Sequence, residues 1–367
     1  MAYKASSDRA LFLTTSLLAI FGLVILYSAS SVTAADEQFG KSPYSFLLQL
    51  IWAGMGYSMM IALMNIDYHT WQGGRLVRIL LVLSAASLLL VFVSPEVNNA
   101  HRWIRYGRAS LQPSEMAKLV ILMFVAGYLH KHESEINLLK ERLVPCLAVV
   151  LSFAAVIAIE PDLGQSVCLC LIVFILLFMA GLKWKYIGIA AAAGAPLGIT
   201  VVIWHFGYQL DRILVFLNPS LDPLGKGWQI TQSLTAVGSG GALGLGLGAG
   251  KQKLWFLPEA PSDFIFAIVG EELGLIGTSL ICLAFLFFFY RGIKIAFKAP
   301  DSFGFYLAMG ITLMVALQAF LNISMVLSLM PTKGIALPFI SQGGSSLLLN
   351  LTATGILLNI SNYTEKS

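Results

Sequence analysis

Charge is scarce in this sequence. Lys, Arg, Asp and Glu make up 11% of the 367 residues, and hydrophobic residues make up 57%. A soluble globular domain contains about 25% charged residues, so this composition excludes a soluble protein. We also expect no cleavable signal peptide, because the apolar run over residues 10–34 is too long for one and no small-residue cleavage site follows it. The sequence therefore predicts an integral membrane protein whose first apolar segment is retained.

Cysteine is scarce as well, and the four cysteines all lie inside apolar runs: Cys146, Cys168, Cys170 and Cys282. Cys168 and Cys170 are two positions apart, so on a helix their side chains point in different directions. We therefore expect four free thiols that form neither a disulfide nor a metal site.

Long apolar runs are the abundant feature, and each crossing of a membrane takes about 20 residues. We predict an all-α polytopic membrane protein with about ten transmembrane helices, forming one integral unit over residues 1–367. The predicted spans are 10–33, 46–64, 76–94, 114–130, 143–160, 165–182, 187–206, 263–290, 304–330 and 341–360.

Ten spans place both termini on one side of the membrane, and the Lys and Arg residues indicate which side. With the termini inside, thirteen of these residues fall in the inner segments and five in the short outer loops. Lys and Arg concentrate in short cytoplasmic loops, so we predict cytoplasmic termini. Three of the five outer exceptions, Arg102, Arg105 and Arg108, cluster in one loop.

The one long loop, about residues 207–262, is predicted on the outer face between spans seven and eight. It contains the glycine-rich stretch GSGGALGLGLGAG over residues 238–250 and is too apolar for a disordered linker. We therefore expect it to be partly embedded, as backbone buried against protein. GLGLGAG superficially resembles a dinucleotide-binding fingerprint, but no βαβ unit surrounds it. Close helix packing by glycine is the favoured explanation, with ligand contact as the alternative.

Three polar clusters map to the outer face. The first spans residues 98–118, where the arginines suit phosphate contacts or, alternatively, interfacial anchoring. Glu115 and Lys118 follow at i,i+3 inside an apolar run, where they can pair. Charged residues inside a membrane span are functional candidates by default. A structural ion pair that orients the span is the alternative.

The second cluster is EPDLGQS over residues 160–166, where Glu160 and Asp162 are expected at the surface, in a functional site or a tight turn. The third cluster consists of the long loop, its exit into span eight, and the segment before the last span. The polar residues of this third cluster could contact substrate or pack within the protein, and the sequence favours neither role. They include Arg212, Gln229, Lys253, Glu259, Lys333, Ser341 and Ser345.

The segment LPEAPSDFIFAIVGEELGLIG, residues 257–277, carries several carboxylates at different depths. Ser262 is expected to cap span eight, with Asp263 in its first turn at the membrane–water boundary. Glu271 is eight residues further on, about 12 Å deeper, so Glu271 and Glu272 are expected to hold helices or loops. Asp263 is a candidate general base, or alternatively a carboxylate that only compensates the helix dipole.

Together these motifs resemble the SEDS family (shape, elongation, division and sporulation), and the resemblance covers nearly the whole chain. The motifs are RWI-x-x-G and QPSE-x-x-K within 102–118, PDLG at 161–164, LPE-x-x-x-DFIFA-x-x-GEELG at 257–274, and LPFIS-x-GGSS at 337–346. DPLGKGWQITQSLTAVGSGG at 222–241 resembles the division-type FtsW branch more than the RodA branch, with a sporulation-type relative still open. The chain departs from the family pattern at Pro261–Ser262, where His-Thr is usual, at Gln342 for Tyr, and at Gln165 for Thr.

The resemblance implies a ten-span glycosyltransferase that polymerises lipid II into peptidoglycan. Asp263 matches the family's essential aspartate and would take the proton from the acceptor's 4-hydroxyl. That oxygen attacks the anomeric carbon of the donor, undecaprenyl pyrophosphate leaves, and an inverted β-1,4 bond forms. The candidate substrate-binding residues are Arg102, Glu115, Lys118, Arg212, Gln229, Lys253, Glu259, Lys333, Ser341 and Ser345. Arg102, Lys118, Arg212 and Lys253 are the candidates for stabilising the pyrophosphate; a divalent cation would also suit it, although the sequence has no dedicated ligand cluster.

The family also implies partners and a location. A class B penicillin-binding protein would supply the transpeptidase that this chain lacks, together with other division proteins of the membrane, and no nucleic acid is involved. The expected location is the bacterial plasma (inner) membrane at the division septum. Two rival functions stay open: a lipid II flippase, and a scaffold without catalytic activity that recruits the transpeptidase.

Overall fold

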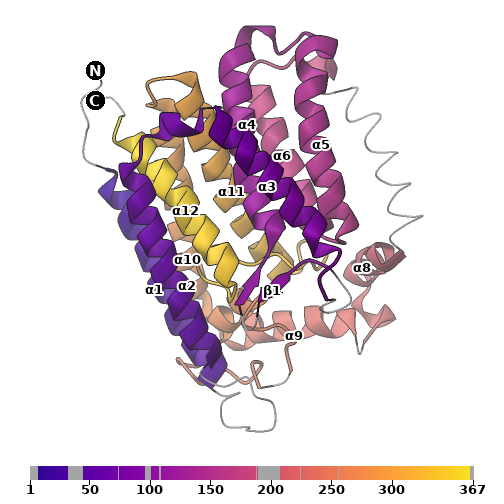
Figure 1. The fold of residues 1–367 in the computed structure, drawn as a ribbon. Helices are drawn as coiled ribbons and strands as arrows, with labels where there is room; N and C mark the ends of the chain where they lie inside the picture. The colour runs from indigo at the N-terminus through magenta and orange to yellow at the C-terminus, as the bar shows by residue number, and fades with distance from the viewer. Residues whose placement is uncertain are drawn as a thin grey trace.

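The protein is a helical bundle with one small hairpin (Figure 1). The computed structural model describes residues 7–31, 44–72, 74–95, 101–106, 109–186, 188, 207–223, 225–254 and 256–363. Its α-helices are α1 (Arg9–Ser31), α2 (Tyr44–Asn65), α3 (Arg75–Val91), α4 (Pro113–His132), α5 (Val144–Ile159), α6 (Leu163–Met179), α8 (Gly207–Leu217), α9 (Lys226–Ser239), α10 (Ile265–Phe297), α11 (Ser302–Val326) and α12 (Gly344–Ser361). Strands β1 (Ile104–Tyr106) and β2 (Ala109–Leu111) pair antiparallel, and short helical turns are η2 (Tyr68–Trp71), η3 (Glu133–Glu135), η4 (Leu139–Leu143) and η5 (Pro219–Leu221).

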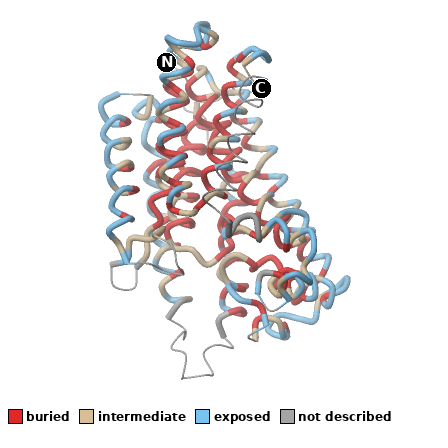
Figure 2. Tube along the Cα trace, turned by 90° about the vertical axis from the view of Figure 1, so that its right-hand side faces the viewer, coloured by how far each residue is buried: buried red, intermediate tan, exposed pale blue. Residues whose placement is uncertain are grey.

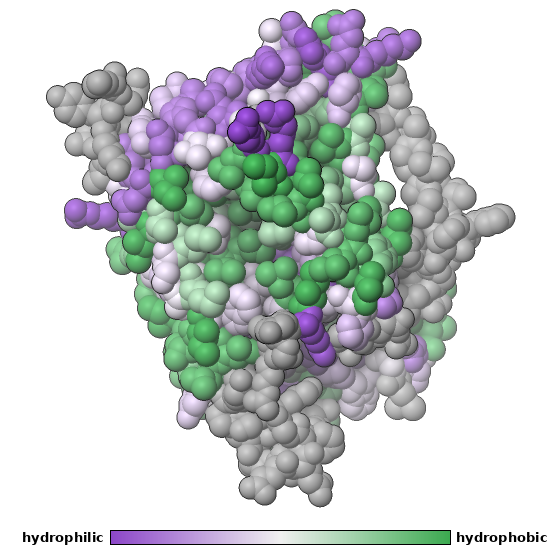
Figure 3. Space-filling model, in the orientation of Figure 1, coloured by the Kyte–Doolittle hydropathy of each residue, from purple (hydrophilic) through white to green (hydrophobic). Residues whose placement is uncertain are grey.

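Helices α1 to α6 and α10 to α12 coincide with predicted spans, whereas α8 and α9 lie within residues 207–262, which were predicted as the long loop. The seventh predicted span, residues 187–206, lies outside the described residues apart from position 188. Among the described residues, six helices are long and apolar enough to cross a membrane. Exposed residues follow the outer helices of the bundle (Figure 2), and a hydrophobic band covers the middle of the face in Figure 3. The protein is therefore a multi-pass membrane protein, and the full count of ten spans stays a prediction.

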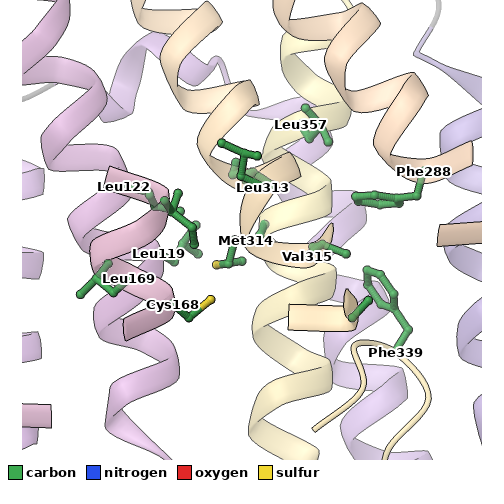
Figure 4. Close-up of a cluster of buried hydrophobic side chains, with 14 of the residues drawn as sticks. Leu119, Leu122, Cys168, Leu169, Phe288, Leu313, Met314, Val315, Phe339 and Leu357 are labelled. Carbon is green, nitrogen blue, oxygen red and sulfur yellow. The ribbon is translucent and has the colours of Figure 1, made fainter. Parts of the chain in front are cut away.

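The centre of the bundle is formed by α4, α11 and α12. In α11, 72% of the apolar window is buried, and in α12 78%, against 28% in α2 on the outside. Side chains such as Leu122 of α4, Leu169 of α6 and Met314 of α11 gather between these helices (Figure 4). α4 carries Glu115 and Lys118, and charged side chains within a span face the interior of a bundle rather than lipid, which explains why α4 lies inside. Polar side chains on these helices must therefore find partners inside the protein.

The described ends of the chain meet at one end of the bundle (Figure 1). The backbone amide of Asp8 donates to the Ser361 hydroxyl at 3.0 Å, and the Asp8 carboxylate pairs with Arg291 at the end of α10. An even number of crossings produces this arrangement. It agrees with the predicted topology, although which side of the membrane holds the ends stays a prediction.

Helix α10 is interrupted at Gly274, whose φ of 64° and ψ of −159° leave the helical region. The freed carbonyls of Glu271 and Glu272 accept the backbone amides of Leu245 and Gly246, each at 3.0 Å. The freed amides of residues 275 and 276 donate in turn to the carbonyls of residues 241 and 242, at 2.9 and 3.2 Å. The glycine-rich stretch thus replaces the hydrogen bonds that the break removes, which an apolar environment requires.

Glycine at position 244 is needed for this close approach. We expect Gly244→Ala to lower the free energy of unfolding by more than about 2 kcal/mol, because the left-handed backbone alone disfavours a side chain by about 1–2 kcal/mol and the methyl group would also collide with the Glu272 backbone. Gly244 has a φ of +80°, and a methyl group there would lie 2.2 Å from the Glu272 carbonyl oxygen. Gly248 is the matched control, since its φ is +84° but nothing lies within 4 Å of a methyl group. Thermal unfolding in detergent should show the larger loss for Gly244→Ala, and equal losses would contradict a packing role.

Candidate functional site

Asp263 lies in a turn just before α10. The backbone amides of Ser262 and Asp263 both donate to the Glu259 carbonyl at 3.1 Å, and the Ser262 hydroxyl donates to the Glu259 carboxylate at 3.0 Å. The helix begins at Ile265 and its N-cap is Phe264. The expectation that Ser262 caps this helix was therefore wrong. The turn places Asp263 ahead of the helix, where the residue as a whole is partly exposed.

A small polar pocket lies beside Asp263. It is lined by Arg102, Pro161, Asp162, Leu163, Gly164, Arg212, Lys333 and Gly334. A methyl group placed on Gly334 would lie 3.2 Å from Asp263 Oδ2 and 3.9 Å from Arg102 Nη1, so both groups border one point of the wall. The three polar clusters on the predicted outer face, far apart in the sequence, therefore converge here.

Three cations face the pocket. Arg102 Nε and Nη2 donate to the carbonyls of Glu160 and Pro161 at 3.1 and 2.6 Å, and Arg212 Nη1 donates to the Thr332 carbonyl at 2.9 Å. Burial lowers the pKa of Lys333, and the neighbouring charge of Arg212 lowers it further. Arg212 and Lys333 repel each other, and an anionic ligand would relieve that repulsion, as the lining carboxylate of Asp162 does in part.

The turn at residues 160–162 is buried, contrary to the expected surface position of Glu160 and Asp162. Asp162 caps α6 by accepting the Gln165 amide at 3.3 Å, and it also accepts the Gln112 side-chain amide at 2.9 Å. Burial, with the charge of Asp162 second, raises the pKa of Glu160 to about 8, so Glu160 is mostly neutral at pH 7. Pro161 has a φ of +28°, and its carbonyl accepts a hydrogen bond from Arg102. The turn therefore forms part of the pocket wall.

The protonation of Asp263 is set by opposing influences. Burial, followed by the charge of Glu259, raises the pKa of the Asp263 carboxyl to about 7. The charges of Arg102 and Arg212 act in the opposite direction. A carboxylate whose pKa lies near the working pH can both accept and release a proton, which suits a general base.

Glu115 and Lys118 form the predicted ion pair, 3.1 Å apart and 3% and 0% exposed. The Lys118 ammonium also donates to Gln165 Oε1 at 2.6 Å and to Gln318 Oε1 at 3.1 Å, and Gln165 donates back to Glu115 at 3.0 Å. This cluster joins α4, α6 and α11. Neither charge lines the pocket, so their proposed contact with substrate stays a prediction.

The structure places Lys253 away from the pocket. Its ammonium donates to the Ser28 carbonyl and hydroxyl at 3.0 and 3.1 Å and to Glu272 at 2.5 Å. The neighbouring Glu271 carboxylate accepts the backbone amides of Lys251 and Gln252 at 2.7 and 3.2 Å. Glu271 and Glu272 therefore fasten the loop to α10 and α1, the structural role that the sequence indicates.

The remaining candidates contribute to the backbone around the site. The hydroxyl of Ser341 accepts the Leu337 amide at 2.7 Å, and that of Ser345 accepts the Gln112 amide at 3.3 Å. Gln229 is partly exposed on α9 and does not line the pocket. Arg105 is exposed on β1, and Arg108 lies outside the described residues.

Sequence reasoning missed Gly334, which forms the wall between Asp263 and Arg102. It also missed Gln318 and Asn322, two buried polar residues one turn apart on α11. Polar side chains in an apolar span were the signal that could have identified the last two.

Within the described part of the chain, no group of three His, Cys, Asp or Glu side chains is arranged to hold a metal ion. The carboxylates at the pocket are Asp162 and, beside Gly334, Asp263. Oxygen ligands of this kind, completed by substrate phosphates, are what Mg²⁺ commonly uses. A divalent cation on the substrate therefore stays a prediction.

Comparison with known proteins identifies the family. A family model described as "Cell cycle protein", covering FtsW, RodA and SpoVE, matches residues 8–366. The chain belongs to this family. It is the family that the sequence motifs indicate, also called SEDS.

Relatives within the family are similar over almost their whole length. Stage V sporulation protein E of Bacillus subtilis is 42% identical over 366 residues, which cover 99% of each chain. The probable peptidoglycan glycosyltransferase FtsW of Trichlorobacter lovleyi is 43% identical over 360 residues, covering 97% of this chain and 93% of its own. The sporulation protein and the FtsW protein are thus nearly equally identical to this chain in sequence.

Solved structures of this family have the same fold. A chain from a structure described as "Structural coordination of polymerization and crosslinking by a peptidoglycan synthase complex" aligns with a TM-score of 0.77 and 26% identity, covering 97% of both chains. The rod shape determining protein RodA of Thermus thermophilus aligns with a TM-score of 0.68 and 23% identity, covering 98% of both.

The wall at Gly334 allows a test of the site's geometry. We expect Gly334→Ala to lower activity about tenfold without unfolding the protein, because the added methyl group displaces the Asp263 carboxylate. Gly343→Ala, in the same loop between α11 and α12, is the matched control. There the nearest atom to a methyl group is Ser346 Cβ at 3.5 Å, an ordinary contact. Equal activity of the two variants would show that the position of Gly334 is unimportant.

Proposed function

We propose that this chain is a peptidoglycan glycosyltransferase that polymerises lipid II into β-1,4-linked glycan strands. The observation that carries the proposal is the carboxylate of Asp263 beside a pocket of three cations. The names of the FtsW relatives support the activity, and the family membership supports the membrane setting.

The proposed reaction uses each part of the site once. Asp263 accepts the proton of the acceptor's GlcNAc 4-hydroxyl as that oxygen attacks the anomeric carbon of the donor's MurNAc. The bond from that carbon to the pyrophosphate breaks with inversion, and undecaprenyl pyrophosphate leaves. A pyrophosphate needs charge stabilisation rather than protonation, and Arg102, Arg212 and Lys333 supply positive charge at the pocket.

The proposed setting is septal cell-wall synthesis in the bacterial inner membrane, with both termini in the cytoplasm. The proposed partner is a class B penicillin-binding protein, which would supply the crosslinking activity. The similar chain with a TM-score of 0.77 comes from a synthase complex that coordinates polymerisation with crosslinking, which supports such a pairing.

Purified chain and partner, reconstituted in vesicles with lipid II, provide the test. A partner whose transpeptidase serine is replaced keeps the products uncrosslinked and easy to resolve on a gel. Glycan strands that appear only when the chain is present support the proposal. Movement of lipid II across the bilayer without polymer would instead favour a flippase, and neither activity would favour a scaffold.

A further inference from the structure

Asn322 connects the turn of Asp263 to the wall of the pocket. The residue is fully buried on α11, and its Nδ2 donates to the backbone carbonyls of Asp263 at 2.8 Å and Ile335 at 2.7 Å. Both partners can only accept hydrogen bonds, so the orientation of the amide is fixed. One side chain therefore joins two segments that are 72 residues apart in sequence.

The Asp263 carbonyl depends on this contact. A carbonyl one turn before a helix commonly accepts a helical amide, but the Ala267 amide donates to Phe264 at 2.9 Å instead. Without Asn322, this partly buried carbonyl would lose its protein partner, which favours a different position of the turn.

We propose that Asn322 is a positioning residue that holds the Asp263 carboxylate against the cationic pocket. The inference rests on the proposed function, in which Asp263 is the base. The second hydrogen-bond partner of Asn322, Ile335, directly follows Gly334. A methyl group on Gly334 would border both Asp263 Oδ2 and Arg102 Nη1. The Asn322 side-chain amide thus holds both the turn that carries Asp263 and the segment of the pocket wall that faces it.

A second amide on α11 supports the same segment. Gln318, one turn before Asn322, donates to the Ala336 carbonyl at 3.0 Å and accepts from the Lys118 ammonium at 3.1 Å. Gln318 therefore holds the segment of the wall, whereas Asn322 alone of these two reaches Asp263. The buried ion pair of Glu115 and Lys118 on α4 is therefore linked to the pocket wall through Gln318.

The test compares Asn322→Leu with Asn359→Leu in the reconstituted polymerisation assay. Asn359 is the matched control, because it is equally buried and bridges two backbone groups, Tyr68 N and Met64 O, both at 2.8 Å, at the opposite end of the bundle. We expect Asn322→Leu to lower kcat about 10- to 100-fold with a nearly unchanged KM, since small displacements of a catalytic group have effects of this size. We also expect the pH midpoint of kcat to rise, because the carboxylate moves away from the arginines.

The rate of carbodiimide labelling of Asp263 against pH, read by peptide mass spectrometry, gives a readout without turnover. If the pH midpoint of Asp263 labelling rises in Asn322→Leu but not in Asn359→Leu, Asn322 positions the Asp263 carboxylate. If Asn322→Leu leaves both the labelling midpoint and kcat unchanged, the proposal is overturned. If it lowers the amount of folded protein but leaves the labelling midpoint unchanged, Asn322 has a structural role only, which also contradicts the proposal. Wild-type activity of Asp263→Asn would instead overturn the proposed function on which the inference rests.

Discussion

Asp263→Asn is expected to lower the rate of lipid II polymerisation by about 10²- to 10⁴-fold, the usual contribution of a general base. The amide has the size of the carboxylate but cannot accept the hydroxyl proton, so the pocket and the turn stay in place. The measurement is the rate of glycan-strand formation by the chain with its partner. Equal melting temperatures of the two proteins would confirm that the turn is intact.

The pH dependence provides a second part of the same prediction. The carboxylate must be ionised to act as a base, so the rate should fall as the pH drops below the pKa of Asp263, about 7. Glu259→Gln removes a negative charge that raises this pKa, so the midpoint should move to lower pH. Undiminished polymerisation by Asp263→Asn, or a midpoint that Glu259→Gln leaves in place, would contradict the assignment.

Glu272→Ala is expected to lower the free energy of unfolding by about 3–5 kcal/mol, because it leaves the buried ammonium of Lys253 without its counter-charge. The two side chains are 1% and 0% exposed, and Ser28 is the other group that contacts this ammonium. The measurement is thermal or denaturant unfolding in detergent, with the wild type and the variant in the same micelle.

The double variant Lys253→Met/Glu272→Leu is the control, since replacing both charges by apolar groups often restores stability. It also decides the role of Lys253. A folded double variant with normal polymerisation shows that Lys253 is structural, as its position in this structure indicates. A folded but inactive one would show that Lys253 contacts the substrate, the role that the family resemblance implies.

The sequence predicted the apolar helices and the polar clusters, but some details were wrong where contacts between segments determine the structure. Asp162 was expected at the surface and is buried, because Gln112 from the start of α4 satisfies its carboxylate. Ser262 was expected to cap α10, but its hydroxyl turns back to Glu259 and the helix begins later. The partner of Asp162 is 50 residues away in the sequence, whereas Ser262 has a local partner that forms a turn in place of a helix cap.

Composition and periodicity by themselves determined the class of this protein. Long apolar runs require a membrane, and the burial of Glu271 and Glu272 follows from their depth in such a run, because charges there must be paired. The motifs determined the family and singled out Asp263.

Only the tertiary structure decided which charges face the pocket and which are paired inside the bundle. Arg102, Arg212 and Lys333 come together beside Asp263, whereas Lys118 and Lys253 find buried carboxylates instead. The physical reason is that a cation's role depends on whether a counter-charge lies within reach. That distance is set by how helices far apart in the sequence pack against one another.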